Sequence, residues 1–254
     1  MRAITVRDRA AGAAGLTRSD IPHPHAAEND VIVRVHAAGF TPGELDWPGT
    51  WTDRAGRDRT PSVPGHELSG VVTKLGYGIT GLTVGQRVFG LADWTRDGSL
   101  AEYTAVEARN LAPLPADIDH TVAAALPVSG LTAWQGLFDH ARLKTGQTVL
   151  IHGAAGGFDV IGGEVLERSA PLVRAGGTLV TIVGPPNVRP ADGRAIFFVV
   201  EPDRFRLADL AGRVRSGRLK PIVGAVRPLA EVPSAFAPDR RLPGKTIIRV
   251  TQGG

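Results

Sequence analysis

The 254-residue chain contains no cysteine, so neither disulfide bonds nor zinc sites with thiolate ligands are possible. It also lacks a long apolar run, because the strongest one, residues 196–200, is too short to cross a membrane. The first residues, MRAITVRDRA, do not contain the apolar stretch of a signal peptide. These absences predict a cytoplasmic protein with no membrane partner.

Tracts of like charge are also lacking. The formal net charge of +4 could by itself suggest a nucleic-acid partner. However, the basic residues are dispersed among acidic ones, and the densest group, in residues 204–220, lies along a predicted helix. Leu207, Leu210 and Val214 form the apolar stripe of that helix, so we interpret the basic group as its solvated face. No nucleic-acid partner is expected.

Residues 1–116 have the pattern of an all-β unit. Short runs rich in β-branched residues are separated by turn signals such as TPGE and VPGH, and no run predicts a helix of convincing length. A small β-barrel is the expected architecture. The strands that we expect lie at residues 3–6, 31–37, 68–74 and 86–90.

From residue 117 onward, helices and strands alternate. A helix capped by Asp117 or Asp119 is broken at Pro127 and resumes toward Leu143. Alternation of this kind predicts a parallel sheet. The remaining expected elements are a buried strand at 149–152, a short helix that begins after residue 163, and strands at 178–183 and 244–250.

A small-residue turn, residues 153–157, follows the expected strand at 149–152. Such a turn lets the backbone approach a pyrophosphate, which then lies at the N-terminus of the next helix. Here no helical pattern follows directly, because residues 158–163 have the pattern of the end of another strand and its loop. The turn is therefore either a phosphate cradle made of backbone amides alone or a remnant that only joins two strands.

Several segments together, in matching order, resemble the medium-chain dehydrogenase/reductase superfamily, in its zinc-independent NADPH:quinone oxidoreductase-like branch. They are VIVRVHAAGFTPGELDW, VPGHELSGVV, GLTVGQRVFG, GSLAEYTAV, ALPVSGLTAWQGL, GQTVLIHGAAGG, LVRAGGTLVTIVG and GKTIIRV. The resemblance implies a mixed α/β and all-β protein, in which a GroES-like β-barrel is followed by a Rossmann-type domain. The implied barrel covers 1–116 together with 229–254, and the implied Rossmann-type domain covers 117–228.

Relative to that family, the chain has an internal deletion at the 157/158 join. Each strand–helix–strand crossover takes roughly 30 residues, so about 60 or more are absent and the parallel sheet is truncated. The absent part would include the helix that receives the pyrophosphate and the segment that contacts the adenosine ribose. The resemblance implies hydride transfer from NADPH to a quinone or a conjugated enone, and a possible homodimer.

The resemblance also implies a set of cofactor-binding residues. Ser129 and Thr132 would lie at the nicotinamide, and Lys245 would approach the phosphates. Each has a structural alternative, since the first two lie on a predicted helix and Lys245 precedes a strand. The full implied set is Ser129, Thr132, Gly153, Ala154, Ala155, Gly156, Gly157, Val183, Gly184, Phe197, Phe198 and Lys245.

On the substrate side, the resemblance points to Thr41, Glu44 and Trp47, although relatives usually offer an asparagine where Thr41 stands. Trp47, Trp51 and Trp94 could stack on a flat ligand or simply cover the barrel. His66 is a metal ligand in zinc-binding relatives, but no cysteine is available to join it. We therefore interpret His66 and Glu67 as a structural turn and expect no metal.

The sequence is compatible with three hypotheses about function. The chain is an NADPH-dependent reductase that tolerates the deletion, a non-redox descendant that binds or rearranges a flat small molecule, or a defective remnant. The remnant would aggregate, because a parallel sheet without its central strands exposes unpaired edges. Cofactor binding and cooperative unfolding distinguish the three.

Overall fold

A computed structural model describes residues 1–151, 162–237 and 243–251. The chain divides into two compact units. Unit 1 comprises Met1–Pro127 and Pro202–Gly254, and unit 2 comprises Val128–Glu201. The domain boundaries that we expected from the sequence remain a prediction.

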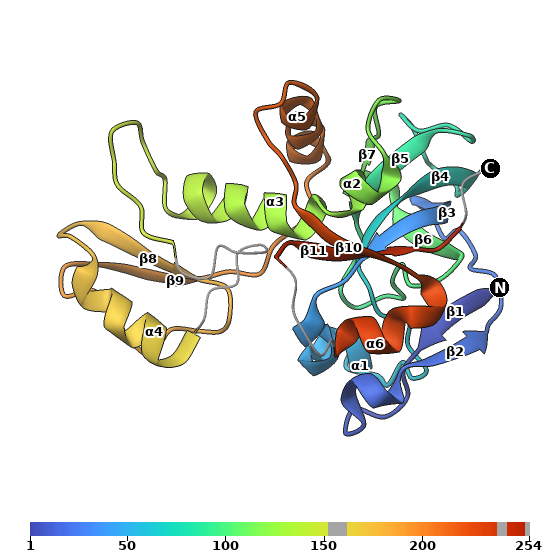
Figure 1. The fold of residues 1–254 in the computed structure, drawn as a ribbon, viewed down its shortest axis with the longest axis horizontal. Helices are drawn as coiled ribbons and strands as arrows, with labels where there is room; N and C mark the ends of the chain where they lie inside the picture. The colour runs from blue at the N-terminus through green and yellow to red at the C-terminus, as the bar shows by residue number, and fades with distance from the viewer. Residues whose placement is uncertain (152–161, 238–242, 252–254) are drawn as a thin grey trace. The chain divides into compact units, whose positions relative to one another are not determined.

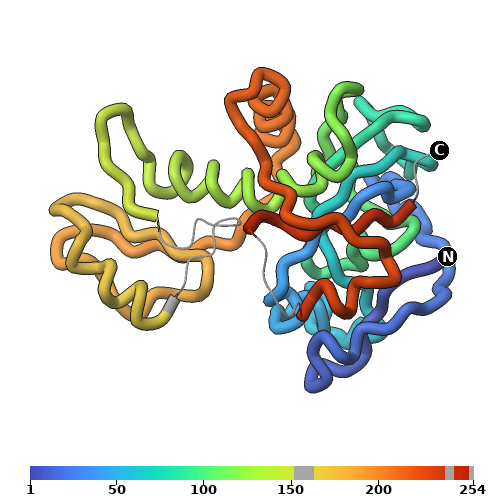
Figure 2. Tube along the Cα trace, in the orientation of Figure 1, coloured from blue at the N-terminus to red at the C-terminus, as the bar shows by residue number. Residues whose placement is uncertain are grey.

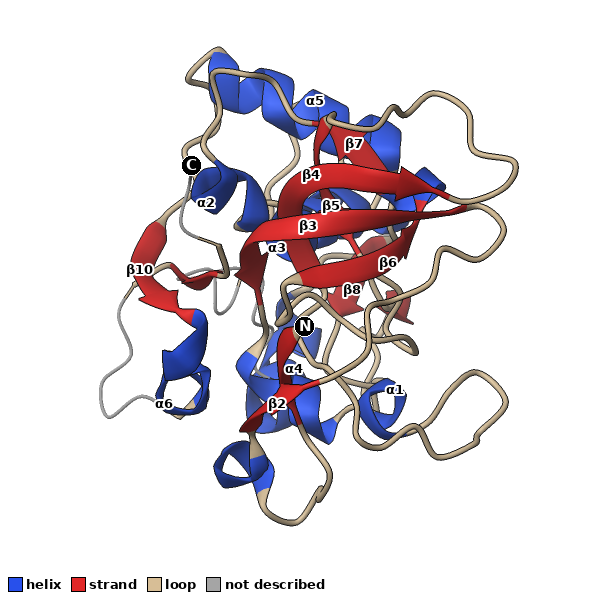
Figure 3. Ribbon diagram, turned by 90° about the vertical axis from the view of Figure 1, so that its right-hand side faces the viewer, coloured by secondary structure: helices blue, strands red, loops and turns tan. Residues whose placement is uncertain are grey.

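Unit 1 is built on a seven-stranded sheet, in the order β10-β11-β3-β4-β5-β7, with β6 also paired to β3 (Figures 1 and 3). All neighbours are antiparallel except β10 and β11. A separate hairpin pairs β1 with β2. The bounds are β1 Arg2–Thr5, β2 Thr17–Asp20, β3 Asp30–Gly39, β4 Glu67–Leu75, β5 Arg87–Leu91, β6 Tyr103–Glu107, β7 Leu111–Pro113, β10 Val223–Pro228 and β11 Lys245–Arg249.

The strand β3 is the centre of this unit, because it pairs with β4, β6 and β11. Most of its side chains are buried, as expected for a run of Val, Ile and Ala in a central strand. The C-terminal strand β11 lies between β10 and β3, so that the end of the chain returns to its N-terminal part (Figure 2). The strands expected near residues 3–6, 31–37, 68–74, 86–90 and 244–250 are all confirmed.

Short helices complete unit 1. Asp119, and not Asp117, caps α2, since its carboxylate accepts a hydrogen bond from the Thr121 amide at 2.7 Å. The predicted amphipathic helix is α5, which buries Leu207 and Leu210. The helices of this unit are α1 Pro48–Trp51, α2 His120–Ala124, α5 Arg204–Arg215 and α6 Val232–Phe236, with 3₁₀ turns at Gly12–Gly15, Pro42–Asp46, Ala108–Asn110 and Leu229–Glu231.

Unit 2 contains a parallel pair of strands, β8 and β9, packed against a helix. The strand register joins Leu179 to Ala195, and Leu166, Ala170 and Leu179 form a small core. This arrangement confirms the truncated parallel sheet expected from the sequence. The bounds are α3 Pro127–Trp134, a π-helical turn Gln135–His140, α4 Gly162–Ser169, a 3₁₀ turn Ala170–Leu172, β8 Gly177–Thr181 and β9 Gly193–Phe197.

The strand expected at 149–152 is wrong for the residues that the structure describes. Val149, Leu150 and Ile151 are not in a strand, and 45%, 63% and 36% of their surfaces are exposed. A strand needs a paired neighbour, and in unit 2 the described strands β8 and β9 pair only with each other. The small-residue turn at 153–157 and the 157/158 join lie outside the described residues.

Within the described ranges, none of the helices has both the length and the hydrophobicity that a bilayer span requires.

Candidate functional site

The residues that the resemblance directs to the substrate, Thr41, Glu44 and Trp47, lie together in unit 1, around the 3₁₀ turn that begins at Pro42. The Glu44 side chain is buried and turned inward. Its carboxylate accepts hydrogen bonds from the Gly65 amide at 2.6 Å and from the Thr41 amide at 3.4 Å. Glu44 therefore fastens this loop to the turn before β4.

His66 belongs to the same cluster. Its Nδ1 lies 3.5 Å from Glu44 Oε2, and the imidazole is buried. Neither ring nitrogen has a hydrogen-bond partner among the described residues. Since a buried polar atom without a partner costs about 1–3 kcal/mol, such an atom calls for an explanation.

The indole of Trp94 lies against this imidazole, and the indole of Trp47 lies against Trp94. The ring centroids of His66 and Trp94 are 5.0 Å apart, and Trp47 meets Trp94 edge-to-face, also at 5.0 Å. An imidazole beside a carboxylate can hold or transfer a proton, and the indoles offer flat apolar surface. Sequence reasoning interpreted His66 as part of a turn and missed this grouping. The signal was the GHE motif, but only the tertiary fold brings it to Glu44.

Lys245 forms an ion pair with Glu67, and both side chains are largely buried. Lys245 is the first residue of β11 and Glu67 is the first residue of β4, and these two strands flank β3. Gly39 of β3 leaves the space for the pair, because a Cβ there would lie 2.7 Å from Glu67 Oε2. The lysine that the resemblance directs to the cofactor phosphates thus has an acidic partner inside unit 1.

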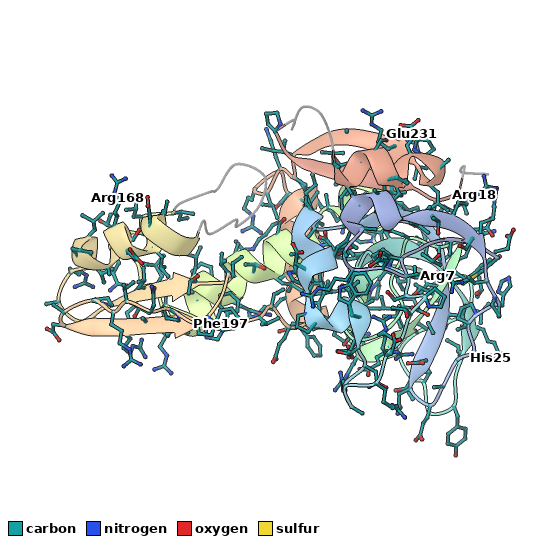
Figure 4. All side chains as sticks on the ribbon, turned by 90° about the horizontal axis from the view of Figure 1, so that it is seen from below. Arg7, Arg18, His25, Arg168, Phe197 and Glu231 are labelled. Atoms are coloured by element: carbon teal, nitrogen blue, oxygen red, sulfur yellow. The ribbon has the colours of Figure 1, made fainter. Side chains whose placement is uncertain are left out.

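In unit 2, the implied nicotinamide-side residues occupy three segments. Thr132 is buried and Ser129 is partly buried on α3. Val183 and Gly184 follow β8, where Val183 is 59% exposed and a Cβ added to Gly184 would meet nothing within 4 Å. Phe197, labelled in Figure 4, ends β9 and is partly exposed, and Phe198 is buried.

The structure brings Phe198 against the π-helical turn that continues α3. Its ring lies 4.4 Å from that of His140 and also faces Gly136. Gln135 holds the segment that follows Phe198. Its side-chain Nε2 donates to the Glu201 carbonyl at 2.8 Å, and its Oε1 accepts from the Glu201 backbone amide at 3.1 Å. The loop after β9 is therefore held by side-chain bonds as well as by packing.

No cluster of three or more His, Asp or Glu side chains suited to a metal ion occurs in the described part of the chain. His66 and Glu44 provide two donors of that kind, whereas a catalytic zinc site takes three protein ligands.

Comparison with known families gives two matches that follow one another along the chain. Residues 27–116 match the alcohol dehydrogenase GroES-like domain, and residues 139–248 match the zinc-binding dehydrogenase family. Among curated proteins, the rat quinone oxidoreductase is 33% identical over 158 residues, which is 62% of this chain and 46% of that protein. The tomato 2-methylene-furan-3-one reductase is 27% identical and covers 91% of this chain, with 74% of its own length aligned.

Solved structures reproduce the fold along nearly the whole chain. A quinone oxidoreductase from Coxiella burnetii superimposes with a TM-score of 0.86 at 21% identity, covering 99% of both chains. A mycobacterial protein, Rv1454c, complexed with NADPH has a TM-score of 0.85 at 22% identity and covers 98% of this chain and 100% of that chain. At this level of identity the likeness concerns the fold.

The chain has a GroES-like sheet unit followed by a truncated parallel α/β unit, and the two family matches occur in the same order. This combination defines a medium-chain dehydrogenase/reductase. The chain belongs to this superfamily, in its quinone oxidoreductase-like branch, and the resemblance seen in the sequence is confirmed. It spans about half the length of the curated quinone oxidoreductases that it matches.

Proposed function

We propose that this protein is an NADPH-dependent reductase that transfers hydride to a quinone or to a conjugated enone. The observation that carries the proposal is the unit 1 cluster of Glu44, His66, Trp47 and Trp94. Flat indole surface beside an imidazole–carboxylate pair suits a flat carbonyl compound. NADPH would give up a hydride and leave as NADP⁺, and the reduced oxygen or carbon would take up a proton.

The nicotinamide-side residues of unit 2 fit one end of such a cofactor. Val183 is exposed and a Cβ added to Gly184 would meet nothing within 4 Å, so this loop leaves space for a ligand. Thr132 offers a hydroxyl and Ser129 a second one on the same helix. These residues would position the ring, while Thr41 and Trp47 would face the substrate and Glu44 would orient His66. When bound, NADPH supplies the hydride.

A second candidate is a non-redox descendant that binds a flat small molecule without a dinucleotide. The observation that favours it is the exposure of Val149, Leu150 and Ile151, which precede the small-residue turn. In a complete nucleotide-binding fold the corresponding strand lies inside the parallel sheet and is buried. From there it presents the turn to the pyrophosphate.

Calorimetric titration of the full chain with NADPH, and with NADH for comparison, tests the proposal. We expect micromolar binding, weakened about 10-fold or more by Thr132→Val, which removes a hydroxyl at nearly constant volume. Thr178→Val on β8 is the matched control and should bind like the wild type. Turnover of a naphthoquinone and of an enone should then follow. Absence of heat up to millimolar NADPH, with cooperative unfolding retained, would favour the non-redox candidate.

A further inference from the structure

Two histidines far apart in the sequence stack on each other in unit 1. His36 lies in β3 and His120 is the first residue of α2. Their ring centroids are 4.5 Å apart and their planes are inclined by 21°. Helix α2 packs on β3, β4, β5 and β11, so the pair lies where the helix meets the sheet (Figure 1).

The contacts of His120 fix its proton. Arg87 Nε lies 3.3 Å from His120 Nε2, and a guanidinium can only donate, so Nε2 must be the unprotonated acceptor. The ring proton is then on Nδ1, which donates to Ser69 Oγ at 2.7 Å. Ser69 in turn donates to the Val88 carbonyl at 3.1 Å. This chain of hydrogen bonds exists only while the imidazole is neutral.

Arg87 itself has little freedom to adjust. Its two terminal nitrogens donate to three carbonyls in the segment that leads into α2, at 2.7–3.0 Å. A proton on His120 Nε2 would therefore face a guanidinium that is held in place. On the other side, His36 Nε2 is buried and has no hydrogen-bond partner among the described residues.

The charges around the pair are mostly positive. Arg34 and Arg87 oppose protonation of His36, and Asp119 is the acidic group that favours protonation of His120. The Asp119 carboxylate already accepts hydrogen bonds from the Thr121 amide and hydroxyl, and the charge of Arg249 also acts on it. Of the other charged groups on the elements packed against α2, Lys74 of β4 is exposed, and the rest form ion pairs, which are Asp30–Arg96 at β3, Glu67–Lys245 of β4 and β11, and Arg227–Glu231 at β10.

We propose that His36 and His120 form an acid-sensitive latch that holds α2 on the sheet of unit 1. Protonation of either ring places a cation beside the other ring and beside Arg87, and protonation of His120 also ends the acceptor role of Nε2. The helix is then released from β3 and β4. At neutral pH both rings are uncharged and the latch is closed.

The direction of titration agrees with this geometry. Burial, then Arg34 and Arg87, lower the pKa of His36. Burial, then His36 and Arg87, lower the pKa of His120 to about 4. Since both pKa values are lower in the folded chain than the ordinary 6.5, the unfolded chain binds protons first. The stabilisation from both lowered pKa values is complete above pH 6.5 and falls as the pH drops below that value, and the share from His120 is lost as the pH approaches 4.

Release of α2 reaches the proposed cofactor site through the chain itself. Helix α2 ends at Ala124, and α3, which carries Ser129 and Thr132, begins at Pro127. We expect NADPH binding to weaken in the same pH range, a consequence that rests on the proposed function. The latch itself does not, because it is measured on the protein without cofactor.

Urea unfolding of the full chain between pH 7 and 5 tests the latch. The unfolding equilibrium constant should rise by up to about tenfold per pH unit for each linked histidine. His120→Gln should reduce this slope, because a neutral side chain replaces the titrating one. His25→Gln, in an exposed loop, is the matched control and should keep the wild-type slope. Equal slopes in all three proteins would overturn the proposal.

A second measurement does not depend on a variant that folds. Imidazole carbon–proton signals of the wild type, followed by NMR, should show two of the seven histidines with a lowered pKa, with that of His120 at about 4 and that of His36 below the ordinary 6.5. Amide exchange at Ala123, Ala125 and Leu126, corrected for the intrinsic pH effect, should accelerate relative to α5 amides. Ordinary titration of all seven rings, or parallel exchange of α2 and α5, would contradict the latch.

Discussion

At the scale of single residues, two acidic side chains of unit 1 take different roles. Glu44 accepts backbone hydrogen bonds and faces His66, whereas Glu67 pairs with Lys245. Both are buried. The family resemblance implied Glu44 and Lys245 as site residues, but it did not give the partner of either side chain. The Lys245–Glu67 pair depends on strand register, which places Gly39 opposite both Glu67 and Ile247.

The buried Glu67–Lys245 pair makes the first prediction of stability. Lys245→Met removes the cation and leaves a buried carboxylate without its charge partner, so we expect a loss of about 3–5 kcal/mol in the free energy of unfolding. Urea denaturation measures this loss. Lys220→Met, at an exposed position, should change stability by less than about 0.5 kcal/mol.

The double variant Lys245→Met/Glu67→Leu separates charge from packing. Replacing both partners with apolar side chains removes the unpaired charge, so much of the lost stability should return. If the double variant is as unstable as Lys245→Met alone, the ion pair is not what stabilises this part of the sheet.

At the scale of elements, the sequence predicted most strands of unit 1 and the start of α2, because alternation and capping are local signals. It did not predict how α3 ends. The helix expected to resume toward Leu143 becomes a π-helical turn at Gln135–His140, with the Ala141 amide bonded to the Gly136 carbonyl at 3.0 Å. A local pattern does not contain the contacts of this turn, because Gln135 bonds to Glu201, 66 residues away.

The two bonds of Gln135 to the Glu201 backbone give a prediction at this scale. Gln135→Ala removes both side-chain partners of the Glu201 backbone, and because Glu201 is exposed, we expect a cost of about 0.5–1.5 kcal/mol per lost hydrogen bond in local opening. Hydrogen exchange at the Glu201 amide and at residues 198–200 should accelerate. The expected control is Gln147→Ala, since Gln147 caps only an exposed turn at Lys144. Unchanged protection at Glu201 would mean that packing of Phe198 suffices.

At the scale of the whole molecule, the order of the two fold types and their superfamily were predictable, since they depend on segments spread over nearly the whole chain. The fate of the strand at 149–152 was not. Its sequence is that of a buried strand, but burial requires neighbours that a local pattern does not contain. The described structure leaves Val149, Leu150 and Ile151 exposed, and β8 and α4 of unit 2 share a small buried cluster, at Leu166, Ala170 and Leu179.

The two units also differ in the apolar packing that stabilises them. Unit 1 buries two large clusters, one around Phe40, Leu100 and Ile248 and one around Leu68 and Val88. Stability scales with buried apolar surface, so unit 2 should open at a lower free energy than unit 1. Unfolding of the chain is then not two-state, and different probes should report different midpoints.

This difference gives the last prediction. Three of the four tryptophans, Trp47, Trp51 and Trp94, belong to unit 1, and the fourth, Trp134, lies in unit 2 and is replaced by Phe in every protein compared. Backbone circular dichroism and exchange in α4 and β8 should then show a transition at lower urea than fluorescence. Leu179→Ala should lower only the first midpoint, since it opens a cavity in the small core. Leu68→Ala opens a cavity in the core of unit 1, so it should lower the second midpoint, through a loss of about 2–5 kcal/mol in the free energy of unfolding of that unit. Coincident midpoints in the wild type, shifted equally by both substitutions, would show instead that the truncated unit is stabilised only as part of one cooperative fold.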